Sequence, residues 1–231
     1  MRFMPRGVAP VVVGVVPAAG RAERLQPLAG SKELIVIRGR PVIDHLLDRL
    51  RAAAPDEIRV VTSPEKDDVV RYAADLGLAV ILARPATVAE SLASGLSGLR
   101  ADDVVLFGFP DTLWDPADGF VSLRRAVEDG AEIALGVFAG REPERSDVVA
   151  LDDTRTRVES VHVKEASPPT RLVWGCLAAR AGTLADVAEH AEPGHLLDRL
   201  ARAGRVAAVD FGTELVDVGT PEALAAAGGA G

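Results

Sequence analysis

The sequence predicts an α/β fold built on a mainly parallel, doubly wound sheet, because strand-like and helix-like segments alternate through the first 140 residues. Residues 11–16 are a valine run with one glycine, which is typical of a strand buried on both faces. Residues 42–50 place Val, Ile and Leu at helical spacing directly after Pro41, a favourable residue for opening a helix. Together these two segments predict the first strand and the first helix of the sheet.

The same alternation continues along the first part of the chain. A short extended segment is expected at 34–37, and a strand at 58–62 is followed by the cap-like Ser63-Pro64-Glu65 and a helix through 69–76. Further strands are predicted at 79–82, 104–107 and 133–138, and further helices at 88–99 and 117–129.

The second part of the chain has a different character. Three strand-like segments follow one another without intervening helices, which predicts antiparallel pairing, at 148–151, 158–163 and 173–178. After them the sequence predicts helices near 184–189 and 196–203, strands at 206–211 and 214–216, and a helix that starts at Thr220-Pro221-Glu222. We therefore expect one domain over residues 1–231, with a larger part at 11–140 and a smaller one at 141–231.

Charge and cysteine content limit the classes of partner and compartment. Lys and Arg number 26 against 34 Asp and Glu, a formal net charge of −8, which argues against nucleic acid or an anionic membrane as the partner. The single cysteine, Cys176, lies in an apolar run and is interpreted as a buried thiol rather than a nucleophile. One cysteine allows no internal disulfide, so we expect a reducing, cytoplasmic location.

The residues most informative about chemistry follow the first strand. Ala18, Ala19 and Gly20 are small, so their backbone N–H groups could approach a phosphate chain at the carboxyl end of that strand. Arg24 and Lys32 lie just beyond and could place positive charge on phosphoryl oxygens. The spacing matches neither a dinucleotide fingerprint nor a Walker loop. From these residues alone, an ordinary turn carrying two surface cations remains an equal alternative.

This stretch resembles the signature of the sugar-1-phosphate nucleotidyltransferases, and specifically the glucose-1-phosphate thymidylyltransferase-like members. The resemblance rests on Arg24-Leu25, Pro27, Lys32-Glu33-Leu34 and Arg40-Pro41 in register. Later landmarks follow in the family's order, at 107–111, 146–149, 158–164, 174–175 and 216–222. It implies a Rossmann-like fold of the nucleotide-diphospho-sugar transferase type, in which 11–140 is the nucleotide-binding part and 141–231 the sugar-phosphate-binding part.

The resemblance also implies roles for particular residues. Arg24 and Lys32 would be catalytic, holding the triphosphate and the leaving pyrophosphate, while Ala18, Ala19, Gly20 and Thr87 would bind the nucleotide. Asp111 and Asp217 would hold Mg²⁺, which takes one or two carboxylates together with substrate phosphates. Lys164 would bind the sugar phosphate, and Gly175 and Asp147 would contact the sugar. The implied partners are a nucleoside triphosphate and a sugar-1-phosphate, and the sequence leaves a homo-oligomer open.

Two alternatives to sugar-nucleotide synthesis remain open at this point. Pro-Ala-Ala-Gly openings also occur among cytidylyltransferases, so a polyol or choline phosphate could replace the sugar phosphate. A non-catalytic module that binds nucleotide or sugar phosphate is the second alternative, although it has little need for both Asp111 and Asp217. The sequence assigns neither the base nor the sugar, because residues 87–90 and Asp147 depart from the family's pattern at the positions that contact them.

Overall fold

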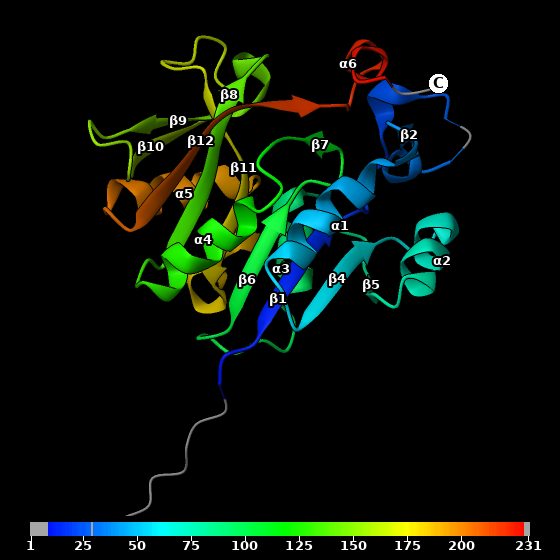
Figure 1. Cartoon of the computed structure of the whole chain (residues 1–231), viewed down its shortest axis with the longest axis horizontal. Coiled ribbons are helices and arrows are strands. Elements are labelled where there is room, and N and C mark those ends of the chain that lie inside the picture. The colour runs from blue at the N-terminus through cyan, green and yellow to red at the C-terminus, as the bar shows by residue number, and fades with distance from the viewer. Residues whose placement is uncertain (1–8, 29, 229–231) are drawn as a thin grey trace, which may run out of the picture.

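The computed structural model describes residues 9–28 and 30–228, and its centre is a twisted sheet to which ten strands contribute within those residues (Figure 1). Strand β1 (Val12–Pro17) lies in the middle, parallel to β4 (Glu57–Thr62) on one side and to β6 (Val104–Gly108) on the other. Strand β5 (Ala79–Leu82) extends this parallel part beyond β4. The predicted parallel, doubly wound sheet is thereby confirmed.

A strand from the second part of the chain enters the middle of the sheet. Strand β11 (Leu172–Arg180) runs antiparallel between β6 and β8 (Ile133–Gly140). Strand β12 (Val206–Asp217) then pairs in parallel with β8, and its last residues pair with the short β7 (Thr112–Leu113). The two parts of the sequence therefore interleave in one sheet.

The antiparallel subregion predicted for the second part is also present. Strands β9 (Asp147–Leu151) and β10 (Val158–Val163) pair antiparallel, and β9 joins the main sheet where Val148 pairs with Val173. A separate hairpin is formed by β2 (Val36–Ile37) and β3 (Arg40–Pro41).

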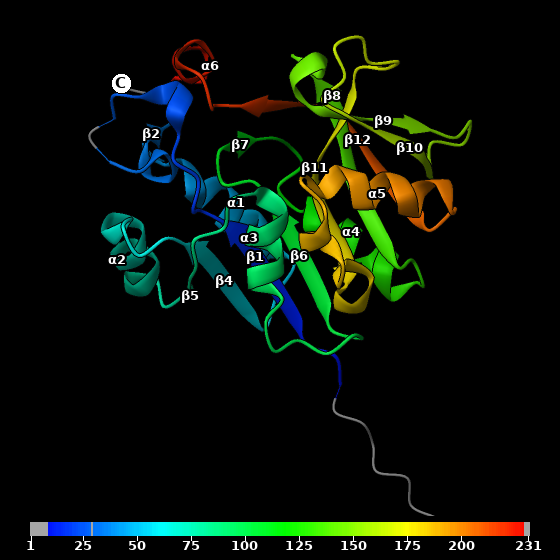
Figure 2. The ribbon, with the colours of Figure 1, turned by 180° about the vertical axis from the view of Figure 1, so that it is seen from behind.

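Helices cover both faces of the sheet, as Figures 1 and 2 show from opposite sides. One face carries α1 (Val42–Ala52) and α4 (Gly119–Glu128), with α2 (Asp67–Asp75) beside the outer strands. The other face carries α3 (Val88–Gly95) and α5 (Pro193–Arg202). The short α6 (Pro221–Ala226) ends the described chain next to the β2–β3 hairpin.

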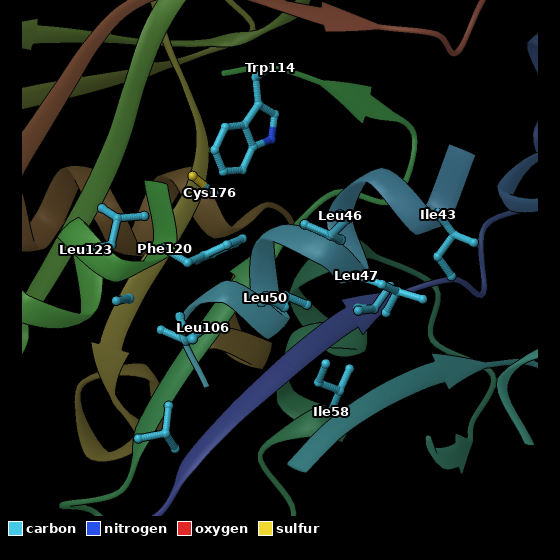
Figure 3. Packing of buried hydrophobic residues seen from close by; sticks show 14 of the residues in the cluster. Ile43, Leu46, Leu47, Leu50, Ile58, Leu106, Trp114, Phe120, Leu123 and Cys176 are labelled. Atoms are coloured by element: carbon cyan, nitrogen blue, oxygen red, sulfur yellow. The ribbon is translucent and has the colours of Figure 1, made fainter. Parts of the chain in front are cut away.

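The core follows from the apolar faces of these helices. Figure 3 shows Ile43, Leu46, Leu47 and Leu50 of α1 packed toward the sheet with residues of α4 and β6. Cys176 is fully buried in the same cluster, and burial raises the pKa of its thiol, so it is a packing residue as predicted. No helix among the described residues combines the length and apolar character needed to cross a membrane.

Some element predictions were wrong. The helix expected at 184–189 is replaced by two 3₁₀ turns, Ala181–Leu184 and Val187–Glu189. The amides of Ala181 and Gly182 donate to the carbonyls of Asp103 and Ala101, so the backbone is tied to a neighbouring loop before an α-helix can start. The strands predicted at 206–211 and 214–216 are one strand with an irregularity between Asp210 and Glu214, because β8 continues beside both.

Helix α3 also ends earlier than the predicted residue 99. At its last residue, Gly95, an added Cβ would collide with the side chain of Val15 in β1, so the helix and the sheet are in contact there. Gly98 then adopts a φ of +76°, a left-handed conformation that suits the turn after a helix.

Candidate active site

Lys32 and Asp111 form the centre of the site, at the carboxyl ends of the central strands. Lys32 lies in the 3₁₀ turn Lys32–Leu34, Asp111 follows β6, and the Lys32 Nζ is 2.6 Å from Asp111 Oδ2. The two side chains are 21% and 14% exposed. Burial alone would lower the pKa of Lys32 and raise that of Asp111, but their attraction outweighs it, so the pKa of Lys32 is raised and that of Asp111 lowered. Both groups are therefore charged at neutral pH.

Asp217 is brought beside Asp111 by strand pairing. In the β12–β7 ladder Asp217 is the partner of Thr112, and the Val218 N–H donates to the Asp111 carbonyl at 2.9 Å. Burial, and then repulsion from the Asp111 carboxylate, raise the pKa of Asp217. This mutual repulsion is what a bound cation would relieve.

The two aspartates suit a divalent cation that substrate phosphates help to bind. Mg²⁺ in such sites takes one or two carboxylates and completes its shell with phosphate oxygens and water. Within the described residues no group of three or more His, Cys, Asp or Glu side chains is arranged to hold a metal. Asp111 and Asp217 therefore fit a metal that arrives with its nucleotide rather than a permanently caged ion.

Arg24 faces Asp217 across a glycine. The Arg24 Nη2 lies 3.9 Å from Asp217 Oδ2, and both side chains are more than half exposed. A Cβ on Gly219 would lie 2.8 Å from Asp217 Oδ1 and 3.1 Å from Arg24 Nη2, so only glycine leaves room for both. The Gly219 N–H also donates to Asp217 Oδ1 at 2.7 Å.

Apolar packing holds these polar groups together. A small cluster joins Leu25 and Ile37, on either side of Lys32, to Val218 and to Leu224 of α6. The Thr220 hydroxyl accepts a hydrogen bond from the Ala223 N–H and caps α6, as the Thr220-Pro221-Glu222 sequence predicted. Helix α6 thus anchors the end of β12 against the loop that carries Arg24.

The small-residue loop supplies fewer free amides than its sequence suggested. The Ala18 N–H donates to the Val61 carbonyl at 2.7 Å, so it is used within the fold and has no hydrogen left for a phosphate. Among the described residues, the N–H groups of Ala19 and Gly20 donate no hydrogen bond. A Cβ on Gly20 would be 3.9 Å from the Lys32 Nζ, so this amide lies close to the site's main cation.

Lys66 and Glu33 belong to the site region but were not predicted from the sequence. The Lys66 ammonium donates to the carbonyls of Ala18 and Gly20 and to the Glu33 carboxylate, whose side chain is fully buried. Their signal in the sequence was weak: Glu33 adjoins Lys32, and Lys66 follows the strand next to β1.

Thr87 has a structural role that its sequence also allowed. Its hydroxyl accepts the Glu90 N–H at 3.1 Å, and the Glu90 carboxylate accepts the Ala86 N–H at 2.6 Å, which together cap the start of α3. A nucleotide contact for Thr87 stays a prediction.

The predicted sugar-side residues form a second group. Lys164 is half exposed and paired with Glu192. Asp147 Oδ2 accepts the Trp174 Nε1–H at 3.4 Å, Oδ1 is buried without a partner, and burial raises the pKa of Asp147. Within the described residues no hydrogen bond or ion pair links Lys164 or Asp147 to Arg24, Lys32, Asp111 or Asp217.

Gly175 has a packing reason for being glycine. An added Cβ would collide with Leu215 and lie 3.1 Å from the Phe138 ring, so the space beside it is filled by core side chains. Close approach of a sugar to its backbone was the reason for predicting this residue, and that contact stays a prediction.

A pocket beside Asp217 is lined by residues from both parts of the chain. Arg24 and Asp217 form one wall and Arg141, Arg145 and Ser146 another. Ser146 directly precedes Asp147 in the sequence, but neither Asp147 nor Lys164 lines the pocket. Arg141 is paired with Glu214 and Arg145 with Glu142, so an anionic group would have to compete with these carboxylates. Neither arginine was predicted from the sequence.

A doubly wound sheet with a small-residue loop, two cations and two aspartates at the carboxyl ends of its strands is the arrangement expected of a nucleotidyltransferase. The chain belongs to the family of MobA-like NTP transferase domains, because the sequence model of that family matches residues 14–209. The resemblance to nucleotidyltransferases seen in the motifs is therefore confirmed.

Individual relatives agree with this assignment. The chain is 28% identical over 181 residues to the bifunctional protein GlmU of Zymomonas mobilis, covering 74% of this chain and 40% of that protein. It is 31% identical over 146 residues to a molybdenum cofactor guanylyltransferase of Burkholderia vietnamiensis, covering 62% of this chain and 70% of that protein. The chain spans about 40% of the length of the GlmU proteins it matches.

The fold also matches a solved structure. A Bacillus anthracis protein described as a glucose-1-phosphate thymidylyltransferase, crystallised with sucrose, superposes with a TM-score of 0.82 over 94% of both chains at 16% identity. At this identity the match shows the fold alone.

Proposed function

We propose that this protein is a Mg²⁺-dependent sugar-1-phosphate nucleotidyltransferase that makes a nucleoside-diphosphate sugar and pyrophosphate. The observation that carries the proposal is the convergence of Lys32, Asp111, Asp217 and Arg24 at the carboxyl ends of β1, β6 and β12. A module that only bound nucleotide would have little use for two adjacent carboxylates.

The proposed reaction needs alignment and charge neutralisation rather than a general base. An oxygen of the sugar phosphate attacks the α-phosphorus of the triphosphate, and the bond from that phosphorus to the oxygen bridging to the β-phosphorus breaks as pyrophosphate leaves. A phosphate monoester has a second pKa of about 6, so the nucleophile is already ionised at neutral pH. Lys32 and Arg24 would neutralise the charge that spreads onto the α-phosphoryl oxygens and the leaving group.

Mg²⁺ would be held by Asp111 and Asp217 together with substrate phosphates, where it would neutralise their negative charge. Lys32 already pairs with Asp111 at 2.6 Å, so it would lie within reach of a phosphate held near that carboxylate by Mg²⁺. The small-residue loop, whose Ala19 N–H donates no hydrogen bond within the described residues, would also donate to the triphosphate.

The acceptor would enter through the pocket between Arg24 and Ser146. Lys164 would bind its phosphate, and the unpartnered Asp147 Oδ1 would accept a hydrogen bond from a sugar hydroxyl. Lys164 is paired with Glu192, so its ammonium would have to leave the Glu192 carboxylate in order to bind the incoming phosphate.

A pyrophosphate-release screen tests the proposal. The five common nucleoside triphosphates are each combined with sugar-1-phosphates, including glucose and N-acetylglucosamine forms, with MgCl₂ present. Release that depends on both substrates supports sugar-nucleotide synthesis. The Lys32→Met protein is the control for a contaminating activity. Nucleotide binding without release from any pair would favour the binding module instead.

The similarity to a molybdenum cofactor guanylyltransferase supports one second candidate, guanylyl transfer to a different phosphate monoester. The same four residues would serve this reaction, because only the base and the acceptor differ. Pyrophosphate release that requires GTP together with a phosphate monoester other than a sugar-1-phosphate would favour it.

A further inference from the structure

We propose that Lys66 is a positioning residue that aims the N–H groups of Ala19 and Arg21 at the nucleotide's phosphates. The inference rests on the proposed function, since it assigns the loop's orientation for that reaction. Lys66 immediately precedes α2 and does not itself belong to the predicted phosphate loop.

Every donor of the Lys66 ammonium has a partner in or beside the loop. The Nζ lies 2.8 Å from the Ala18 carbonyl oxygen, 3.1 Å from that of Gly20 and 2.6 Å from Glu33 Oε2. An ammonium has three hydrogens to donate, so these contacts use all of them. Lys66 therefore has no donor left for a substrate and acts through the backbone.

Peptide geometry converts this contact into an orientation of the loop. The peptides 18–19 and 20–21 are trans, because the described cis peptides lie elsewhere. In a planar trans peptide the N–H points opposite to the preceding C=O. Since the carbonyls of Ala18 and Gly20 point to Lys66, the N–H groups of Ala19 and Arg21 point away from it. Neither N–H donates a hydrogen bond within the described residues. The Thr62 hydroxyl also donates to the Ala18 carbonyl, at 3.2 Å, so within the described residues it is the Gly20 carbonyl that depends on Lys66 alone.

Glu33 fixes the ammonium in place. The Glu33 side chain is fully buried and that of Lys66 is 14% exposed, so the pair is shielded from water. Glu33 Oε1 is buried without a hydrogen-bond partner, which leaves Oε2 and Lys66 to hold the carboxylate. Because Glu33 adjoins Lys32 in one 3₁₀ turn, the pair ties the amide loop to the cation that would act with it.

The first turn of α2 holds the far end of the loop as well. Asp68 Oδ2 and Oδ1 accept hydrogen bonds from the Ser31 N–H and hydroxyl, each at 2.8 Å. Residues 18–20 and 31–33 are thus both fastened to the start of one helix.

Three variants separate an effect of Lys66 on the orientation of the loop from an effect on the stability of the protein. Lys66→Met keeps the aliphatic length but removes the three donors and leaves Glu33 buried without its partner, so it alone cannot distinguish the two roles. Lys66→Met/Glu33→Met replaces the buried pair by apolar side chains, an exchange that is often neutral or stabilising. Arg84→Met breaks the exposed pair between Arg84 and Glu65, the neighbour of Lys66, and serves as the matched control.

Each protein is assayed for the KM of nucleoside triphosphate and kcat, and its melting temperature is measured. A separate ¹⁵N–¹H NMR titration with magnesium pyrophosphate follows the amides of Ala19 and Arg21. We expect the double variant to melt near the wild-type temperature with a nucleotide KM raised at least tenfold. The response of the Arg21 amide to magnesium pyrophosphate should be largely lost, whereas that of Ala19 should change less, because the Ala18 carbonyl keeps its hydrogen bond from Thr62. Arg84→Met should match the wild type in all measurements.

A double variant with the wild-type nucleotide KM and the wild-type amide responses to magnesium pyrophosphate would overturn the proposal. Lys66 would then be only a structural partner for Glu33. Wild-type amides of Ala19 and Arg21 that do not respond to magnesium pyrophosphate would also overturn it. If the wild type responds in NMR but releases no pyrophosphate from any substrate pair, the proposed function fails while the orienting role of Lys66 stands.

Discussion

The Lys32 Nζ lies 2.6 Å from Asp111 Oδ2, although 79 positions separate the two residues in the sequence. The contact joins the loop after β1 to the segment after β6, and the two strands are neighbours in the sheet. It places a positive charge beside a proposed metal ligand, so a phosphate held near this carboxylate by a metal ion would also lie near the Lys32 ammonium.

Replacing Lys32 by Met should lower kcat more than it weakens nucleotide binding. The ammonium would act on charge that develops in the transition state, and loss of such a group typically costs about 10²- to 10³-fold in rate. Steady-state pyrophosphate release and equilibrium nucleotide binding measure the two effects separately. An unchanged kcat would remove Lys32 from the mechanism.

Asp217→Asn should abolish most turnover and raise the Mg²⁺ concentration needed for what remains. The substitution keeps the shape of the side chain but removes one of the two charges that would hold the cation. Turnover is measured as a function of MgCl₂, with EDTA-treated wild type as the reference. A variant with wild-type rate and Mg²⁺ dependence would exclude Asp217 as a ligand.

Gly219→Ala should lower kcat/KM by about tenfold, or about 1.4 kcal/mol of transition-state binding, with little change in melting temperature. Its Cβ would press on Asp217 Oδ1 at 2.8 Å and on Arg24 Nη2 at 3.1 Å. The measurement is steady-state kinetics beside a thermal melt. Equal losses of stability and activity would instead indicate a general packing defect.

Opposite effects are expected from the two members of the Lys164–Glu192 pair. Lys164→Ala should raise the KM of the sugar phosphate, whereas Glu192→Gln should lower it, because Lys164 would no longer be held by a carboxylate. The KM of the nucleotide should stay constant in both. Glu165→Gln, next in sequence and paired with His162, is the control. A changed nucleotide KM with an unchanged acceptor KM would contradict the assignment.

Asp103 should make stability depend on acid pH. Its side chain is 3% exposed and accepts hydrogen bonds from Arg100 and from the Val11 N–H, and the Arg100 contacts chiefly lower the pKa of Asp103 to about 2. Stability from a lowered carboxyl pKa is complete above the unfolded value and is lost as the pH falls through the folded value.

Asp103→Asn should therefore lower the free energy of unfolding at neutral pH by about 1 kcal/mol, a figure discounted because Arg100 is partly exposed. The deficit relative to wild type should shrink between about pH 4 and about pH 2. Denaturant titrations across that range check it, with the exposed Asp102→Asn as control. A pH-independent deficit would show that shape rather than charge matters at Asp103.

Local patterns carried most of the fold prediction. The valine run at 11–16 predicted β1, because a strand that is buried on both faces is apolar at consecutive positions. The helical spacing at 42–50 predicted α1, because a helix that is buried on one face repeats its apolar residues every three or four positions. The helix expected at 184–189 failed because Ala181 and Gly182 bond to a distant loop, a constraint that leaves no mark on periodicity.

The sequence by itself predicted most of the strands and helices in their order, the nucleotidyltransferase motifs and the position of the small-residue loop. Only the tertiary structure decided that β11 enters between β6 and β8, that Lys32 pairs with Asp111, and that the Lys66 ammonium bonds to the carbonyls of Ala18 and Gly20. The reason is physical: secondary structure depends on neighbours a few residues away. Contacts between side chains far apart in the chain depend instead on strand order and register, which the whole core fixes together.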